Sequence, residues 1–293
     1  MSQPSFILKF FSTMPVQRDR LVAFASFTKT LFGGRRLSGE FTLGTRDSKA
    51  VEFGDLGIFF DQNLPKWTGC LSVSFSNEAG LSGRCDLLQL RRKNRASRPL
   101  GDIANYRTHE FQIEIDADHR SHAWMHRALF EYFGDVVDLL DAQFAAAHDN
   151  DRFLGPGQYA RGLEAGLPDI YRMTAFGRAF VDLIGTDRLL KLPVTQAKLL
   201  RNGAVAIQLD EDLGNAAAPD VPTKRALVRE TVGLDYFANP GDPTVGMGSL
   251  RGGQIGFWTF VGAILKTKRE GDSPKRLAER HPAIDWSGVF ADN

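Results

Sequence analysis

The sequence predicts an α+β protein with a mixed or antiparallel sheet and helices packed on one face. Three times, an apolar run of strand length is followed by a segment with helical periodicity. These units are residues 6–11 with 15–32, 111–115 with 120–148, and 204–209 with 222–232. No catalytic motif accompanies any of the three, so the recurrence predicts a scaffold and does not name a reaction.

The first unit begins with the run Phe6-Ile7-Leu8-Lys9-Phe10-Phe11, in which Lys9 is the one charge. A continuous apolar run of this length is typical of a strand covered on both faces. Pro15 suits the first turn of a helix, and apolar residues then recur at helical spacing as far as Phe32. Gly33-Gly34 is expected to end this helix.

Residues 40–92 have the pattern of a small antiparallel meander. We expect short strands, separated by Gly-, Pro- and Asn-containing turns, at residues 40–43, 51–60, 68–75 and 86–90. Cys70 and Cys85 are the only cysteines in this chain and both fall in the meander. So few thiols fit a reducing compartment. They are either buried free thiols or a pair that faces across a hairpin.

The second unit contains the most regular helical pattern in the chain. Apolar side chains follow steps of three and four residues at Met125, Leu129, Phe133, Val136, Leu140 and Phe144. Such steps place them on one face of a helix at 3.6 residues per turn. We therefore expect a single helix over residues 120–148.

Gly155-Pro156-Gly157 is the clearest break in the sequence. It divides the chain into residues 1–154 and residues 155–293, which form either two α+β halves or one continuous domain. In the second half, an amphipathic helix is expected over residues 176–184. Asn202-Gly203 is a strong signal for a hairpin turn, so residues 195–200 and 204–209 are expected to pair.

The overall charge is balanced, with 36 Lys and Arg against 35 Asp and Glu, and a formal net charge of +1. Such a balance gives no general attraction to nucleic acid or to anionic lipid. No apolar stretch approaches the roughly 18 residues that a membrane span needs, and the first residues lack the pattern of a signal peptide. We expect a cytoplasmic protein that binds neither nucleic acid nor membrane.

Three histidines give the clearest candidate metal site. His119, His122 and His126 are spaced three and four residues apart, which places them within about 60° of arc on a helix. Neutral imidazoles so arranged share a metal ion, with Asp116 or Asp118 as an oxygen ligand. The alternative is a structural or surface role, because the pattern lacks the glutamate of a metalloprotease motif. No cofactor is expected.

Charged and glycine-rich loops give weaker candidates. Arg91–Arg98 is a basic run, and Gly246–Arg251 is a glycine-rich loop that departs from the dinucleotide-binding pattern where Arg251 stands. Asp210-Glu211-Asp212 would bind a divalent cation or form a polar loop. Long loops of this kind favour protein–protein contact. The anchors expected there are of the types that dominate interfaces: Arg92, Arg95, Arg251 and Trp258.

One part of the chain resembles a known class of proteins. The segments Phe176–Gly185, Leu189–Pro193 and Leu200–Val205 follow a strand and a long helix, as a helix, a Leu-Pro corner and a hairpin. In this general order, residues 109–213 resemble immunity proteins of bacterial polymorphic-toxin and type VI secretion systems. The meander and the residues past 235 are not covered by this resemblance.

The resemblance implies a stoichiometric inhibitor that binds a cognate toxin in the cytosol and carries no catalytic residues of its own. This is the function that we expect from the sequence. Two alternatives from other classes stay open. One is a metal-dependent enzyme that uses His119, His122 and His126, and the other is a structural subunit of a larger assembly, including a homo-oligomer.

Overall fold

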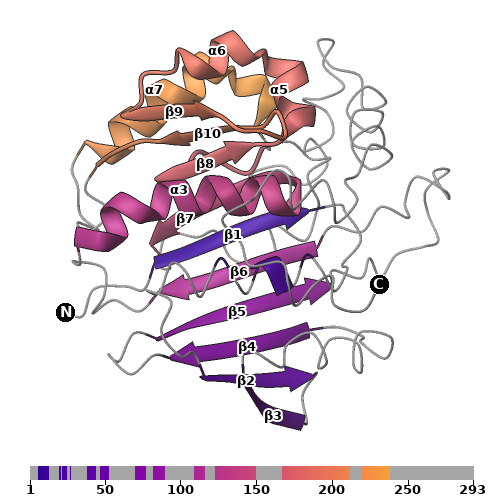
Figure 1. Cartoon of the computed structure of the whole chain (residues 1–293). Helices are drawn as coiled ribbons and strands as arrows, with labels where there is room; N and C mark the ends of the chain where they lie inside the picture. The colour runs from indigo at the N-terminus through magenta and orange to yellow at the C-terminus, as the bar shows by residue number, and fades with distance from the viewer. Residues whose placement is uncertain are drawn as a thin grey trace, which may run out of the picture.

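In a computed structural model of the chain, the described residues are 6–12, 20, 22–24, 27, 38–43, 47–52, 70–76, 82–89, 109–115, 123–149, 167–211 and 220–237. Their strands form one sheet in the order β3-β2-β4-β5-β6-β1-β7-β8-β10-β9 (Figure 1). The strands are β1 (Phe6–Ser12), β2 (Ser38–Leu43), β3 (Asp47–Glu52), β4 (Cys70–Ser76), β5 (Ser82–Gln89), β6 (His109–Ile115), β7 (Ala142–Asp149), β8 (Met173–Phe176), β9 (Gln196–Leu199) and β10 (Val205–Gln208).

Every neighbouring pair of these strands is antiparallel. The predicted α+β class is therefore confirmed, and of the two predicted kinds of sheet the antiparallel one is present. Strands from both sides of Gly155-Pro156-Gly157 belong to this sheet, since β7 is hydrogen-bonded to both β1 and β8. The predicted boundary itself lies outside the described residues.

The meander predicted for residues 40–92 contributes β2 to β5. Its last strand, β5, pairs with β6, while β2 lies between β3 and β4. The strand expected at residues 51–60 begins earlier, at Asp47. In the β4–β5 register, Cys70 is opposite Leu88 and Cys85 is opposite Val73. The two cysteines therefore do not face each other across the hairpin.

The first strand is covered on both faces, as its apolar run predicts. Every residue of β1 except Lys9 is buried, and Lys9 is intermediate. Its neighbours are β6 and β7, so β1 is an interior strand of the sheet. Residues 20, 22–24 and 27, within the helix predicted for 15–32, are helical.

The single helix predicted for residues 120–148 is wrong in its last part. Helix α3 is Ala123–Leu140, and the chain reverses at Asp141 to form the strand β7. Asp141 has φ of 49°, in the left-handed region that ends a helix and that aspartate tolerates better than most residues. Phe144 therefore belongs to β7 and not to the apolar stripe of α3.

Burial explains why an alanine-rich segment with high helical propensity forms a strand. All of β7 is buried, and it pairs with β1 on one side and β8 on the other. Phe10 contacts Phe133 of α3, and its partner in β7 is Ala145. Side chains alternate along a strand, so Ala145 and Ala147 lie on the face beneath α3. Their small size lets the helix lie close to the sheet.

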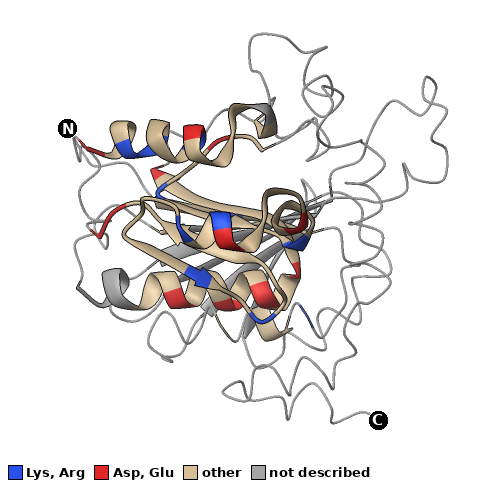
Figure 2. Cartoon of the chain, turned by 90° about the horizontal axis from the view of Figure 1, so that it is seen from above, with Lys and Arg blue, Asp and Glu red and all other residues tan. Residues whose placement is uncertain are grey.

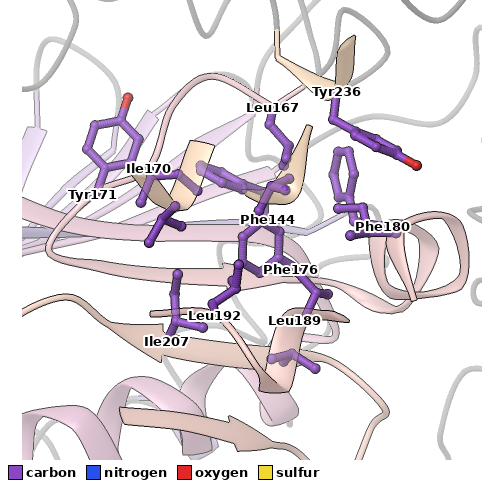
Figure 3. Packing of buried hydrophobic residues seen from close by; sticks show 14 of the residues in the cluster. Phe144, Leu167, Ile170, Tyr171, Phe176, Phe180, Leu189, Leu192, Ile207 and Tyr236 are labelled. Atoms are coloured by element: carbon purple, nitrogen blue, oxygen red, sulfur yellow. The ribbon is translucent and has the colours of Figure 1, made fainter. Parts of the chain in front are cut away.

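The opposite face of the sheet carries a hydrophobic cluster (Figure 3). It joins Phe144, Phe176 and Ile207 of the sheet to helices α5 (Arg178–Ile184), α6 (Thr186–Leu190) and α7 (Val221–Val232), and to the 3-10 helix η7 (Leu234–Tyr236). Helices therefore cover both faces of the sheet, and not one face as the sequence predicts (Figure 2). Side-chain alternation along an apolar strand does not say which face a later helix will cover.

The end of α3 is fixed by donors from four different segments. Its last carbonyl groups accept hydrogen bonds from side chains: Val137 from Asn202 Nδ2 (3.2 Å), Leu139 from Arg20 Nη1 (2.9 Å) and Leu140 from Ser12 Oγ (2.5 Å). The next carbonyl, of Asp141, accepts from Gln143 Nε2 at 3.3 Å. These bonds satisfy carbonyl groups that a helix end leaves without intrahelical partners.

The predicted hairpin at Asn202-Gly203 is confirmed, with β9 and β10 paired in the register Leu199 to Val205. Gly203 has φ of +85°, the conformation that favours glycine in such a turn. The turn also docks on α3, because the main-chain N–H of Asn202 donates to Asp138 Oδ1 at 2.9 Å. The position of β9 is therefore set by α3.

Gly177, between β8 and α5, gives a test of how closely the chain packs here. A Cβ at this position would lie 2.4 Å from Gln143 Cα and 2.5 Å from the carbonyl oxygen of Ala142, both main-chain atoms. We expect Gly177→Ala to lower the free energy of unfolding by about 3 kcal/mol. Denaturant unfolding of the purified variant measures this.

Gly134 is the matched control, since among the described residues a Cβ there would meet only the side chain of Leu200, at 3.1 Å. Alanine also gains about 1 kcal/mol over glycine inside a helix. Gly134→Ala should therefore change stability by less than about 1 kcal/mol. Equal losses in the two variants would contradict the close main-chain approach at Gly177.

Candidate functional site

Three buried charged side chains meet where the strands β7, β8 and β10 end or begin. Asp149 ends β7, Arg172 precedes β8 and Asp210 follows β10. Arg172 Nε lies 3.5 Å from Asp149 Oδ2 and 3.9 Å from Asp210 Oδ2. The main-chain carbonyl of Arg172 also accepts a hydrogen bond from the N–H of Leu209 at 2.8 Å. The cluster therefore ties together the ends of three strands.

This cluster is an internal cross-link and not a surface for a ligand, because Arg172 and Asp149 are each 1% exposed. Burying charges costs several kcal/mol per ion, which mutual attraction offsets only when each has a close partner. The cluster includes Asp210, the first residue of the predicted cation site at Asp210-Glu211-Asp212. Asp210 is buried beside Arg172 while Glu211 is exposed, and Asp212 lies outside the described residues.

His148 lies next to this cluster, edge-on to the ring of Tyr171 at 5.7 Å between centroids. Its Nδ1 accepts a hydrogen bond from the main-chain N–H of Asp149 at 2.8 Å, which requires that nitrogen to be unprotonated. Burial lowers the pKa of His148, and the cations Arg172 and Arg225 lower it further, while the Asp149 carboxylate opposes them. The folded protein therefore favours neutral His148.

A second set of charged side chains holds helix α7 to Asp169, which precedes β8 in the sequence. Arg229 Nη1 lies 2.9 Å from Asp169 Oδ1, and Arg225 Nη1 lies 3.7 Å from Asp169 Oδ2. The guanidinium of Arg229 also lies 4.8 Å from the centre of the Phe237 ring. Both arginines lie on the side of α7 that faces Asp169, and they remain partly exposed. Leu227 of the same helix is half-exposed.

Strand β9 is the candidate functional site. It is at one end of the sheet, so among the described strands it has one neighbour, β10 (Figure 1). Its neighbour β10 is fully buried, whereas Gln196, Lys198 and Leu199 of β9 are exposed. Leu199 is 50% exposed, although its strand joins the hydrophobic cluster through Ala197.

Two elements flank β9. Helix α6 packs against it, and its last residue, Leu190, is 37% exposed. On the other side, Lys198 forms an ion pair with Glu131 of α3. Burial raises the pKa of the neighbouring Asp135, as do the charges of Asp138 and Glu131. An acidic stripe on α3, seen in Figure 2, therefore lies beside the basic side chain of β9.

The histidines of the predicted metal site and the four predicted anchors are not among the described side chains. His119, His122, Arg92, Arg95, Arg251 and Trp258 lie outside the described residues. His126 is in α3, but its side chain is not described. Within the described ranges, no three His, Cys, Asp or Glu side chains are grouped so as to hold a metal ion. The metal site and the four anchors stay predictions.

The sequence carried a signal for β9 that its hairpin prediction did not use. The strand after the turn is the continuous apolar run of residues 204–207, typical of an interior strand. The strand before the turn, Gln196-Ala197-Lys198-Leu199, mixes polar and apolar residues. This contrast between paired strands indicates that β9 is an edge.

No protein-family model matches this sequence, and no curated protein matches it. Among solved structures, the chain is similar to the Pseudomonas aeruginosa T6SS protein PA0821, at 12% identity and a TM-score of 0.49. The similarity covers 98% of this chain and 89% of that chain. No residue role is carried over at this identity.

In the described part of the chain, no helix has the length and apolar character needed to cross a membrane.

The buried histidine gives a pH-dependent prediction. The folded-state pKa of His148 is lowered from 6.5, so the unfolded chain takes up a proton at a higher pH than the folded one. Its contribution to stability is complete above pH 6.5 and is lost as the pH falls toward the folded-state pKa. In that window, this residue should lower the free energy of unfolding by up to about 1.4 kcal/mol per pH unit.

Denaturant unfolding at pH 7.5 and pH 5.5 measures the effect (the pH values are roughly one unit either side of the ordinary histidine pKa). His148→Gln removes the titrating group and should flatten this part of the pH profile. A pH profile that is the same in wild type and His148→Gln would contradict a neutral, buried His148.

Proposed function

We propose that this chain is an immunity protein that neutralises a cognate bacterial toxin effector by binding it in a stoichiometric complex in the cytoplasm. In this proposal it acts by contact and not by catalysis. The observation that carries it is β9, a strand at the end of the sheet with a half-exposed leucine. The resemblance of residues 109–213 to immunity proteins of toxin and type VI secretion systems supports the same function.

An end strand suits an inhibitor for two physical reasons. Its main-chain donors and acceptors bind an extended segment of a partner, and its side chains add specificity. A strand that is pinned in place also loses little conformational entropy when it binds. β9 is pinned by its ladder with β10 and by the bonds from its turn to Asp138 of α3.

The test compares two leucines that are almost equally exposed: Leu199 of β9, at 50%, and Leu227 of α7, at 48%. The wild-type chain is co-expressed in a sensitive bacterium with a candidate toxin effector, and survival is counted. We expect the wild type to protect the cells. Leu199→Glu should weaken protection and raise the dissociation constant of the purified complex at least about tenfold, as loss of an interface anchor does.

Leu227→Glu is the control, and should protect as well as the wild type because it places the same charge on a different surface. Denaturant unfolding of both variants separates loss of binding from loss of folding. If the wild type leaves survival unchanged, the neutralising function is wrong. If both variants protect equally, the function stands but β9 does not carry it.

A further inference from the structure

We infer that β9 recognises its partner by adding a strand to the sheet, and that this strand carries an acidic residue between two apolar ones. The inference rests on the proposed function and deepens it, because it names the chemistry of the segment that the toxin would contribute.

The register determines which main-chain groups face the partner. The N–H of Leu200 donates to the carbonyl of Ala204 at 2.8 Å, so these two residues are a hydrogen-bonded pair. Hydrogen-bonded and non-hydrogen-bonded pairs alternate in an antiparallel ladder. Lys198 and Gln196 therefore bond to β10, and the N–H and carbonyl groups of Ala197 and Leu199 point away from it. They offer a partner strand two donors and two acceptors.

The same register determines what the side chains of an added strand would meet. Ala197 is opposite Ile207 and Leu199 is opposite Val205, so both lie on the face of the hydrophobic cluster. Lys198 lies on the other face, toward Glu131 of α3. A strand paired with β9 would thus place its residues i and i+2 beside Ala197 and Leu199. The residue between them would lie beside Lys198.

Apolar residues are favoured at the two positions of the partner strand that lie beside Ala197 and Leu199, because they would cover the exposed half of Leu199. An acidic residue is favoured between them because opposite charges across a strand pair are stabilising and like charges are destabilising. Lys198 is 44% exposed, and its partner Glu131 comes from α3 rather than from the sheet. Among the described strands, none occupies the position directly across from Lys198, so a partner strand can place a carboxylate there.

Charge also argues against a second copy of the chain as the occupant. A twofold axis that pairs β9 with its own copy through Ala197 and Leu199 would place Lys198 directly opposite Lys198 of the copy. The two lysine side chains would lie on one face of the sheet, with their Cβ atoms about 5 Å apart. A foreign strand with a carboxylate avoids this repulsion.

The experiment uses two hairpin peptides as probes, with outer strands that differ at one position: a Val-Glu-Val core and a Val-Lys-Val core. Fluorescence anisotropy measures their binding to the full-length chain. We expect the Glu peptide to bind at least ten times more tightly than the Lys peptide. Lys198→Glu should reverse this preference, and Leu227→Glu should leave it unchanged.

Ala197→Pro tests strand pairing itself. Proline removes an N–H that points away from β10, so the β9–β10 ladder keeps its bonds, and edge strands accept proline at such positions. We expect at least tenfold weaker binding of the Glu peptide, with the unfolding midpoint close to that of the wild type. If Ala197→Pro unfolds, Leu199→Pro makes the same test at the second outward N–H.

Three results would overturn the inference. They are equal affinity for the two peptides, unchanged binding in a folded proline variant, and a concentration-dependent dimer in light scattering that the proline variant abolishes. The last result would identify a second copy as the occupant. Loss of protection in Leu199→Glu without any peptide preference would refute strand recognition alone. A wild type that fails to protect cells would refute the proposed function alone.

Discussion

The described part of the fold is organised around the reversal of the chain at Asp141. It turns the chain from α3 into β7 within one residue, so the helix lies over the strand that follows it. β7 then joins the strands that precede it in the sequence to those that follow it, since it pairs with both β1 and β8. Without the reversal, residues 142–149 would extend the helix and the sheet would lack its connecting strand.

The end of α3 also positions the candidate site. Asp138 accepts hydrogen bonds from the main-chain N–H groups of Arg201 (3.3 Å) and Asn202 (2.9 Å), in the turn between β9 and β10. Asn202 returns a bond to the carbonyl of Val137. Charged acceptors make these bonds stronger than neutral ones. The edge strand is therefore held in a fixed place relative to the body of the sheet, as a binding surface requires.

Charge is used differently in the interior and at the edge. Arg172 with Asp149 and Asp210 forms a buried cross-link that water and ligands do not reach. Lys198 with Glu131 is exposed, so its pairing is weak and exchangeable. A partner strand with a carboxylate gains more from such a pair than from a buried one, because it need not break a desolvated contact. The exposed pair is thus the one suited to recognition.

Local periodicity and turn chemistry were enough to predict the α+β class, the strand at residues 6–11, the hairpin at Asn202-Gly203 and the helix at residues 222–232. Tertiary structure alone decided that residues 142–149 form a strand, since burial between β1 and β8 overrides the helical propensity of alanine. It alone decided that helices cover both faces. The order of the strands across the sheet also came only from the fold, because it depends on their arrangement in space and not on their order along the chain.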